Sequence, residues 1–373
     1  MAVRSEMLPA PLKALPLRML GAMLAATALG LATLYSAAGG QLAPWARNQG
    51  VRFAVLFGVM LALSYVRVET WRRIAYPGYA IALTMLIVVE AMGHVGMGAQ
   101  RWIDLGFIRL QPSEFMKLAV VLSLARFFHG VPPRYISAPA TLVVPAALIG
   151  APMALVMLQP DLGTALMITF SGVAIMFLAG IQLRWFIGGA ALVAAMLPVA
   201  WNMLHDYQRN RVLIFMDPES DPLGTGYHIS QSKIAIGSSG LFGKGFLQGS
   251  QGQLDYLPEK QTDFIFAAMM EEWGLAGGLF TLAAYGYVIW WGFGLAQRCS
   301  TVFTRLAAMG LSFTLFLYVG INLSMVMGLA PVVGIPLPLF SYGGSAMMTV
   351  MILLGILLSI HREEGRRSRS GRL

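Results

Sequence analysis

Residues 249–273 read GSQGQLDYLPEKQTDFIFAAMMEEW, in which a polar loop gives way to an apolar segment. Asp263 stands at that boundary, so we expect it at the water–lipid surface, at or beside a helix N-terminus where the helix dipole favours the carboxylate. Glu271 and Glu272 follow about two turns later, where a carboxylate is costly unless it is paired or lines a cavity. Acids in these places indicate chemistry at a membrane surface. The alternative is that Asp263 only caps a helix and the two glutamates only face a helix bundle.

The composition is that of a chain that crosses a membrane many times. Of its 373 residues, 57% are hydrophobic and only 12% are charged, which is more apolar surface than a soluble domain of this size can bury. We therefore predict a single all-α polytopic membrane domain over residues 1–373. It should have about ten transmembrane helices, most of them near the length that a bilayer requires, at residues 19–38, 51–66, 74–92, 113–128, 138–158, 163–181, 185–204, 264–295, 304–329 and 345–360.

Lysine and arginine residues indicate which way the chain crosses the membrane. One set of loops holds 16 of the 26 basic residues, the other set holds 9, and Lys117 lies within a predicted helix. The more basic loops of a membrane protein face the cytoplasm, so we expect both termini to be cytoplasmic. Asp263 and the long loop 205–262 then face outward. The Arg-rich tail 361–373 is expected to be disordered and held near anionic lipid.

Several function classes lose support from the composition. The single Cys299 excludes an internal disulfide and a metal site of several cysteines, and the five histidines lack the HExxH or HxxxH spacing. The net charge of +9 is explained by basic cytoplasmic loops, so we do not expect nucleic acid as a partner. The Gly-rich run 237–249 lacks the spacing of a nucleotide P-loop. Its backbone amides could approach an anion, but for Lys244 we favour a mobile loop.

Polar side chains gather on the outward side, where the membrane makes them costly. The loop 96–114 alternates in polarity and can turn at Asp104-Leu105-Gly106, which predicts a small hairpin that dips toward the bilayer. Within it, Arg101 either binds a phosphate or extends to the interface as an ordinary Arg. Glu114 and Lys117 are three residues apart, so they share a helix face and can pair. The pair is either functional or serves only to neutralise itself.

Two further segments place polar groups on the same outward side. Asp161 begins a helix there, either as part of a site or as a plain N-cap. The long loop carries three cations on the same face as Asp263, which favours an anionic ligand: Arg209, Arg211 and Lys233. Prolines and glycines interrupt residues 328–345, which predicts a re-entrant segment lining a cavity. Ser341 and Tyr342 would be its polar tips, and the alternative is an ordinary outward loop.

The motifs together resemble the SEDS family (shape, elongation, division and sporulation). Four of them occur in family order along nearly the whole chain: Arg101-Trp102-Ile103 with Gln111-Pro112-Ser113-Glu114-Phe115-x-Lys117, Gln159-Pro160-Asp161-Leu162-Gly163-Thr164, Leu257-Pro258-Glu259-x-x-Thr262-Asp263-Phe264-Ile265-Phe266, and Pro336-Leu337-Pro338-x-x-Ser341-Tyr342-Gly343-Gly344-Ser345. The short N-terminus, the Gly-Ser-Gln-Gly-Gln approach to Asp263 and the Ser359-Ile360-His361-Arg362 ending look more like the elongation branch than the division branch.

The resemblance implies a ten-helix peptidoglycan glycosyltransferase that polymerises lipid II into glycan strands. It would act at the outer face of the bacterial inner membrane during cell elongation and rod-shape maintenance. The implied partners are lipid II, the lipid-linked glycan, membrane lipid, the elongation complex and a class B penicillin-binding protein of the penicillin-binding protein 2 type. The resemblance makes Asp263 the essential acid. It also matches polar positions of a central cavity to Glu114, Lys117, Asp161 and Ser341, beside which we count Glu272 and Tyr342 as cavity residues.

The residues and the resemblance lead to one mechanistic hypothesis, in which Asp263 takes the proton of the attacking hydroxyl. The leaving pyrophosphate needs a cation, for which the candidates are Arg101, Lys117, Arg209, Arg211 and Lys233, or a divalent ion such as magnesium or manganese. No sequence pattern fixes a metal site, and we expect no organic cofactor. Two alternatives stay open, a lipid II flippase or transporter and a non-catalytic scaffold of a penicillin-binding protein. The clustering of polar motifs on the outward half favours the enzyme.

Overall fold

The computed structural model describes residues 15–92, 94–96, 99–104, 109–203, 206–217, 221, 224–254, 256–257 and 259–370. Among these residues, ten helices have 17 residues or more, and each corresponds to one predicted apolar segment: α1 (Leu17–Ala37), α2 (Trp45–Leu63), α3 (Val68–Met92), α4 (Pro112–Gly130), α5 (Pro139–Leu158), α6 (Leu162–Leu178), α7 (Leu183–Met203), α11 (Ile265–Gln297), α12 (Val302–Val326) and α13 (Gly344–Ser370). The predicted all-helical polytopic fold is confirmed.

Length and apolar composition agree with a membrane bundle. Six of these helices are long and apolar enough to span a membrane, and two shorter apolar stretches follow at Leu162–Leu178 and Leu183–Val199. The two helices outside that set, α2 and α4, carry charged residues within them: Arg47, Arg52, Glu114, Lys117 and Arg126. Charge on α2 and α4 is tolerated where the helix faces protein or the membrane surface rather than lipid tails.

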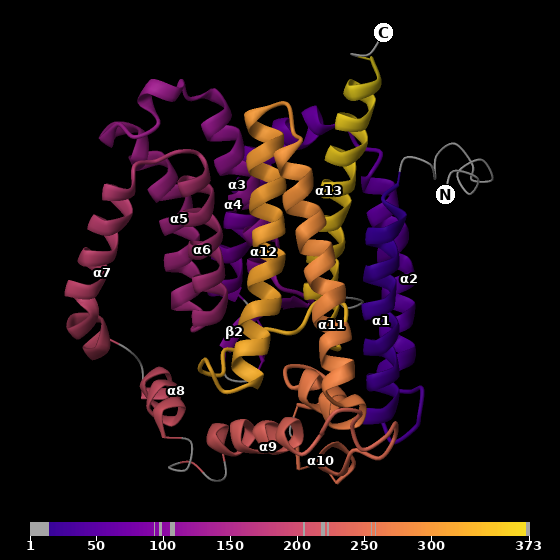
Figure 1. Cartoon of the computed structure of the whole chain (residues 1–373). Coiled ribbons are helices and arrows are strands. Elements are labelled where there is room, and N and C mark those ends of the chain that lie inside the picture. The colour runs from indigo at the N-terminus through magenta and orange to yellow at the C-terminus, as the bar shows by residue number, and fades with distance from the viewer. Residues whose placement is uncertain are drawn as a thin grey trace.

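Helices α12 and α13 form the centre of the bundle. In each, more than seven-tenths of the most apolar stretch is buried inside the protein. Helix α12 packs against α4, α6 and α11, and α13 packs against α2. Helix α1 begins and α13 ends at the same end of the bundle (Figure 1), as an even number of crossings requires. Helix α7 differs, because most of its apolar side chains are exposed.

The predicted hairpin before α4 is confirmed. Strand β2 (Ala99–Asp104) pairs antiparallel with β3 (Arg109–Leu110), with Ile103 opposite Leu110. The predicted turn residues 105 and 106 lie outside the described part of the chain. A third strand, β1 (His94–Gly96), pairs antiparallel with β2 and was not predicted. The hairpin contacts α3 and α4, so it covers the ends of both helices.

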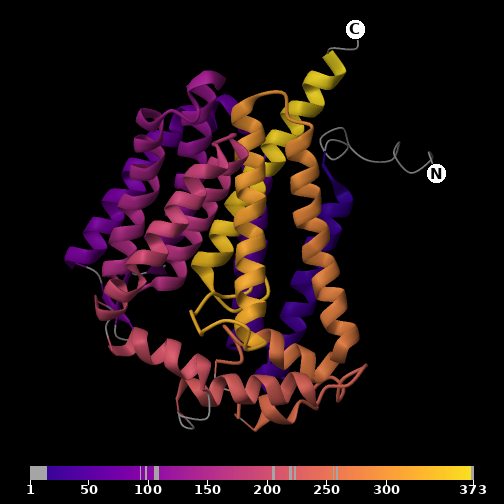
Figure 2. The ribbon, with the colours of Figure 1, turned by 60° about the vertical axis from the view of Figure 1, so that its left-hand side comes forward.

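The segment 205–262, predicted as a long loop, is largely helical where the structure describes it. It contains α8 (Asp206–Met216), α9 (Thr225–Gly237) and α10 (Ser250–Gln253). These helices cross the end of the bundle opposite to the chain ends (Figure 1 and Figure 2). Helix α9 is fastened there, because the Ser232 hydroxyl donates to the Val326 carbonyl at 2.7 Å and Ile229 is buried. The sequence did not predict these helices, because short polar helices of this kind are commonly stabilised by tertiary contacts.

The basic tail is a helix and not a disordered segment, so that prediction was wrong up to Ser370. Helix α13 runs through the tail to Ser370, and residues 371–373 lie outside the described part. Arg367 pairs with Glu363 at 2.8 Å, four residues away on the same helix face. Glu364 accepts a hydrogen bond from the Ser300 hydroxyl at 3.1 Å. These pairs stabilise a helix that composition alone would assign to disorder.

The predicted break between α12 and α13 is confirmed. Residues 327–343 contain no helix. The apolar side chains of the second half face the protein, since Ile335, Leu337, Leu339 and Phe340 are all buried, whereas Met327 and Leu329 in the first half are exposed. Gly30 of α1 allows this segment to approach, because a Cβ at Gly30 would lie 2.8 Å from the Phe340 Cα. Non-helical backbone within a membrane bundle must be covered by protein or line a wet cavity, and residues 335–341 of this segment are largely covered.

Candidate functional site

Asp263 lies in a turn directly before α11, whose N-cap is Phe264. This confirms the predicted place beside a helix N-terminus. The Asn322 amide of α12 donates to the Asp263 carbonyl at 3.0 Å and to the Ile335 carbonyl at 2.8 Å. A Cβ at Gly334, which has a φ of +70°, would lie 3.5 Å from the Asp263 Oδ2. The carboxylate is therefore partly buried between the start of α11 and the segment 327–343.

Ser341 and Tyr342 join the Asp263 turn to the non-helical segment. The Ser341 hydroxyl donates to the Thr262 carbonyl at 2.7 Å and accepts from the Leu337 amide at 2.8 Å. The Tyr342 amide donates to the Gln261 carbonyl at 2.8 Å. The structure thus brings both predicted residues to the Asp263 turn, where Ser341 orders the backbone through its side chain.

Gln49 of α2 supports the same junction from the other side and was not predicted. Its amide nitrogen donates to the Ser341 carbonyl at 2.6 Å, and its oxygen accepts from the Gly343 amide at 3.3 Å. The Arg52 guanidinium lies 4.9 Å from the centre of the Tyr342 ring. No local sequence pattern distinguishes Gln49, because its partners lie almost 300 residues away along the chain.

The predicted pair of Glu114 and Lys117 is confirmed, at 2.7 Å between the Lys117 Nζ and the Glu114 Oε1. Both side chains are almost completely buried. Tyr318 of α12 completes the cluster: its hydroxyl donates to Glu114, and its ring centre lies 4.2 Å from the Lys117 Nζ. Charge-assisted contacts of this kind compensate for part of the cost of burying an ion pair. Sequence analysis missed Tyr318, which lies in an apolar run without any polar signal.

Asp161 and Arg101 lie at a second junction, where the hairpin meets the start of α6. Asp161 is the N-cap of α6 and accepts from the Thr164 amide at 3.1 Å and the Thr164 hydroxyl at 2.9 Å. Gln111 also approaches Asp161, at 3.4 Å. Arg101 donates to the Gln159 carbonyl at 3.1 Å and to the Pro160 carbonyl. Both residues therefore have structural partners that account for their positions.

The sequence predicted an anionic ligand near three cations, and the structure describes the side chains of two of them, Arg209 and Lys233, which have different surroundings. Arg209 donates to the carbonyls of Trp201 and Asn202, at 2.9 and 2.7 Å, and so caps the end of α7. The side chain of Arg211 lies outside the described residues. Lys233 is exposed on α9, and its side chain approaches Gly328, at the start of the non-helical segment. Of these three, Lys233 is the one that the structure places beside the segment covering Asp263.

Glu271 and Glu272 lie just before a break in α11, at Gly274 with φ of 63°. The glycine-rich loop fills this break with its backbone: the Lys244 amide donates to the Glu271 carbonyl at 2.9 Å, and the Gly245 amide donates to the Glu272 carbonyl at 3.1 Å. These loop amides therefore donate hydrogen bonds to carbonyl groups of α11, whereas the sequence suggested that they could approach an anion.

The side chains of both glutamates have partners as well. Glu271 accepts from the Lys244 ammonium at 2.7 Å and from the Gln251 amide at 3.0 Å, at the N-terminus of α10. Glu272 accepts from the Ser36 hydroxyl of α1. Lys244, expected in a mobile loop, is therefore ion-paired. These contacts give both acids a structural role at the end of the bundle.

His228 of α9 is a further residue near the site that sequence analysis did not select. Its ring stacks on Phe264, beside Asp263, with 5.9 Å between ring centres. Burial lowers the pKa of His228, while the nearby carboxylates of Glu259 and Asp221 oppose that shift. The neutral imidazole is thus favoured next to the turn that carries Asp263.

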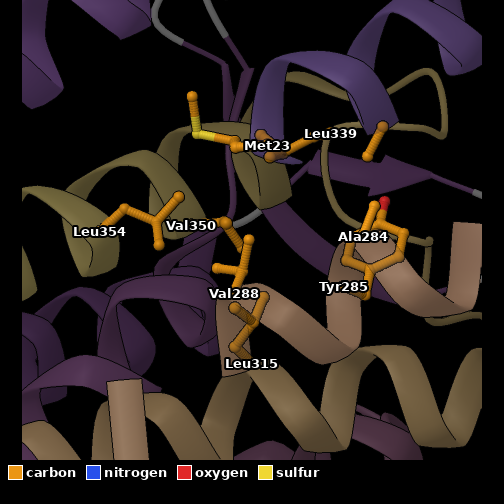
Figure 3. A pocket seen from close by; sticks show the side chains of 9 residues that line it. Met23, Ala284, Tyr285, Val288, Leu315, Leu339, Val350 and Leu354 are labelled. Atoms are coloured by element: carbon orange, nitrogen blue, oxygen red, sulfur yellow. The ribbon is translucent and has the colours of Figure 1, made fainter. Parts of the chain in front are cut away.

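The pocket in Figure 3 lies elsewhere in the bundle and is lined by apolar side chains from α1, α11, α12, α13 and the non-helical segment. Its empty volume is about 270 Å³, and its only polar side-chain group belongs to Tyr285, whose hydroxyl donates to the Pro338 carbonyl. A pocket of this composition offers no group for acid–base chemistry. Among the described residues, no three His, Cys, Asp or Glu side chains are grouped so that they could bind a metal ion.

Comparisons with known proteins agree on one family. A family model described as "Cell cycle protein", covering FtsW, RodA and SpoVE, matches residues 13–366. The peptidoglycan glycosyltransferase MrdB of Escherichia coli (strain K12) is 45% identical over 355 residues, which cover 94% of this chain and 95% of the relative. The match in sequence therefore spans nearly the whole chain.

Two solved structures share the fold. A chain from "Structural coordination of polymerization and crosslinking by a peptidoglycan synthase complex" matches with a TM-score of 0.82 at 33% identity, covering 93% of this chain and 98% of that one. The rod shape determining protein RodA of Thermus thermophilus matches with a TM-score of 0.70 at 29% identity, covering 93% and 96%. The arrangement of the helices is therefore similar along nearly the whole chain.

Proposed function

Because the chain belongs to the FtsW, RodA and SpoVE family, we propose that Asp263 is the general base of its glycosyl transfer. The chain is a multi-pass membrane protein and a peptidoglycan glycosyltransferase of the RodA and MrdB type. The observation that carries the assignment is the position of Asp263. Its carboxylate lies at the end of the bundle, in a turn that Asn322 and Ser341 order from two other elements.

The substrate is lipid II, a disaccharide-pentapeptide on undecaprenyl pyrophosphate. A hydroxyl of the acceptor forms a bond to the anomeric carbon of the donor sugar, and the bond from that carbon to the pyrophosphate oxygen breaks. Asp263 accepts the hydroxyl proton, because a neutral hydroxyl is a poor nucleophile and a positioned base contributes about 10²–10⁴-fold in rate. The exposed apolar side chains of α7 support a lipid-linked substrate, since they face the environment in which its tail moves.

Lys233 is the candidate cation that the structure favours for the leaving pyrophosphate. Lys233 is an exposed residue, and its side chain approaches Gly328, in the segment that continues to Gly334 beside Asp263. The charge of Lys117, in contrast, is already balanced by Glu114, and Arg209 caps α7. A cation close to the developing phosphate charge lowers the barrier to its departure.

A divalent cation would have to be held mainly by the substrate. Mg²⁺ and Mn²⁺ prefer oxygen ligands and commonly combine one or two carboxylates with substrate phosphates. The described residues do not group three acidic, His or Cys side chains, and no catalytic step is assigned to a metal.

The active site faces outward from the bacterial cytoplasmic membrane, and both termini are cytoplasmic. Support for this orientation comes from the excess of Lys and Arg in the loops at the end where α1 begins and α13 ends (Figure 1). The glycan made there is crosslinked by a class B penicillin-binding protein of the penicillin-binding protein 2 type. This partner is supported by the similar chain from a complex of polymerization and crosslinking.

A polymerisation assay tests this function. The purified protein, with its penicillin-binding partner, is supplied with labelled lipid II, and the glycan products are separated on a gel. We expect polymer from the parent and from the charge-matched control Glu69→Gln at the opposite end of the bundle. Asp263→Asn should lose activity by about 10²–10⁴-fold while its melting temperature stays near that of the parent. Full activity of Asp263→Asn would contradict the assignment of the base.

A further inference from the structure

A second pocket, which is polar, lies at the end of the bundle where α1 begins and α13 ends, opposite to Asp263. It is a shallow, partly open pocket formed by the turn between α2 and α3 and by the last turns of α13, with about 250 Å³ of space when the adjoining open solvent is included. Eight residues line it: Ser64, Tyr65, Val66, Arg67, Ser359, Arg362, Glu363 and Arg366. None of them belongs to the site that contains Asp263, so the proposed glycosyl transfer leaves this pocket without a role.

Arg362 is fixed in this pocket before any ligand arrives. Its guanidinium lies 3.6 Å from the centre of the Tyr65 ring, which is close enough for a cation–π contact. It also donates to the Ser64 hydroxyl at 3.4 Å. A guanidinium held in one orientation loses little conformational entropy when it binds an anion.

The one acid in the pocket is already engaged. Glu363 accepts from the Val68 amide at 2.9 Å, at the start of α3, and pairs with Arg367 at 2.8 Å. Arg67 and Arg366 are exposed, and neither has a side-chain partner among the described residues. Three guanidinium groups therefore line a pocket with a single carboxylate, and that carboxylate also pairs with Arg367 outside the pocket.

Guanidinium groups bind phosphate oxygens through paired, charge-assisted hydrogen bonds. The pocket opens where α2 ends, and α2 leads to it with exposed valines at four-residue spacing on one helix face: Val51, Val55 and Val59. Such a face contacts lipid tails, and basic pockets between membrane helices bind anionic lipid headgroups. We propose that this pocket binds the phosphate of an anionic phospholipid whose acyl chains lie along α2.

General attraction between basic loops and anionic lipid would not need a pocket, so the test must separate the two. Arg298 and Arg305 provide the control, because they are exposed at the same end of the bundle but do not line the pocket. Arg298→Gln/Arg305→Gln removes the same charge as Arg67→Gln/Arg366→Gln. General attraction, at roughly the same free energy for each basic residue near the surface, would weaken equally in the two double variants.

The experiment measures lipid binding by the full-length protein in detergent. Its thermal stability is titrated with phosphatidylglycerol, with phosphatidylcholine of the same chain length, and with glycerol phosphate. We expect phosphatidylglycerol to raise the melting temperature more than the other two. The apparent affinity of Arg67→Gln/Arg366→Gln for it should fall by about tenfold or more, equivalent to at least 1.4 kcal/mol, while the Arg298→Gln/Arg305→Gln variant should keep most of its affinity.

Three results would overturn the proposal. Equal losses in the two double variants would assign the effect to general surface charge. Equal stabilisation by phosphatidylglycerol and glycerol phosphate would make the ligand a free phosphate. An increase in melting temperature with phosphatidylcholine as large as that with phosphatidylglycerol would show that binding does not depend on the negative charge of the lipid. Polymerisation of lipid II by the pocket variant is measured in parallel, and because that assay reports on Asp263, either proposal can fail while the other stands.

Discussion

Asp263 is positioned by residues that lie far from it in the sequence. Asn322 is 59 residues away, and Ser341, which bonds to the neighbouring Thr262, is 79 residues from its partner. Each contributes a polar group to the backbone around Asp263 rather than to the carboxylate itself. These contacts hold the backbone of the turn that carries Asp263, the residue that we propose as the general base.

Tyr318 should matter more for stability than an ordinary buried tyrosine, because its hydroxyl donates to the charged Glu114. Hydrogen bonds to buried charged groups contribute about 1.5–3 kcal/mol, and neutral ones about 0.5–1.5 kcal/mol. Tyr285 is the matched control, since it is buried and donates to a neutral carbonyl. Thermal melts in detergent should show a larger loss for Tyr318→Phe than for Tyr285→Phe. Equal losses would mean that Tyr318 does not stabilise the ion pair.

His228 should make the protein less stable at acidic pH. Burial lowers its pKa in the folded state, so between the folded value and the unfolded value of about 6.5 the unfolded chain binds more protons. Stability is therefore lost as the pH falls below about 6.5. Comparing melting temperatures at pH 7.5 and 5.5, we expect a smaller drop for His228→Gln than for the parent. An identical drop in both would show that His228 does not contribute.

At the scale of elements, the close contact of α1 with the segment 327–343 depends on Gly30. A Cβ there would lie 2.8 Å from the Phe340 Cα, whereas a Cβ at Gly21 of the same helix meets nothing within 4 Å. We expect Gly30→Ala to destabilise the protein by about 1–3 kcal/mol through overpacking. Gly21→Ala should be neutral or stabilising by up to about 1 kcal/mol, because Ala favours helix. If thermal melts give both variants the same stability, the contact with Phe340 is not tight.

The long apolar helices could be predicted from the sequence because the bilayer imposes their length and composition. The short helices α8, α9 and α10 could not, since tertiary contacts such as that of Ser232 with α12 stabilise them. The helical tail of α13 was missed because composition does not show that the tail continues a buried helix, with contacts such as that of Glu364 with Ser300 beside the pair of Arg367 and Glu363.

Part of the site could also be predicted, because some of its residues form local patterns in the sequence. Glu114 and Lys117 are close in sequence, and Asp263 is a charged residue at the start of an apolar helix. Tyr318, Gln49 and His228 gave no such signal, because their importance comes from partners in other elements. The sequence also selected Arg101 and Arg209 as ligands of an anion. In the structure, both instead donate hydrogen bonds to carbonyl groups at helix ends.

Across the whole molecule, the two ends of the helix bundle differ in the function that we propose for them. One end carries α8, α9 and α10 (Figure 1), together with the turn that contains Asp263. The other end carries the basic pocket between α2, α3 and α13. Helices α12 and α13 connect the two, and both are largely buried. Glycosyl transfer is proposed for the first end and lipid binding for the second.

The most direct test of the central claim separates binding from chemistry in one variant. Lipid II binding by Asp263→Asn is measured by the shift in melting temperature, and turnover is measured on the same preparation at saturating lipid II. A general base acts in the transition state, so we predict binding within about threefold of the parent and turnover lower by about 10²–10⁴-fold. Loss of binding with turnover preserved at saturation would contradict the account and make Asp263 a binding residue.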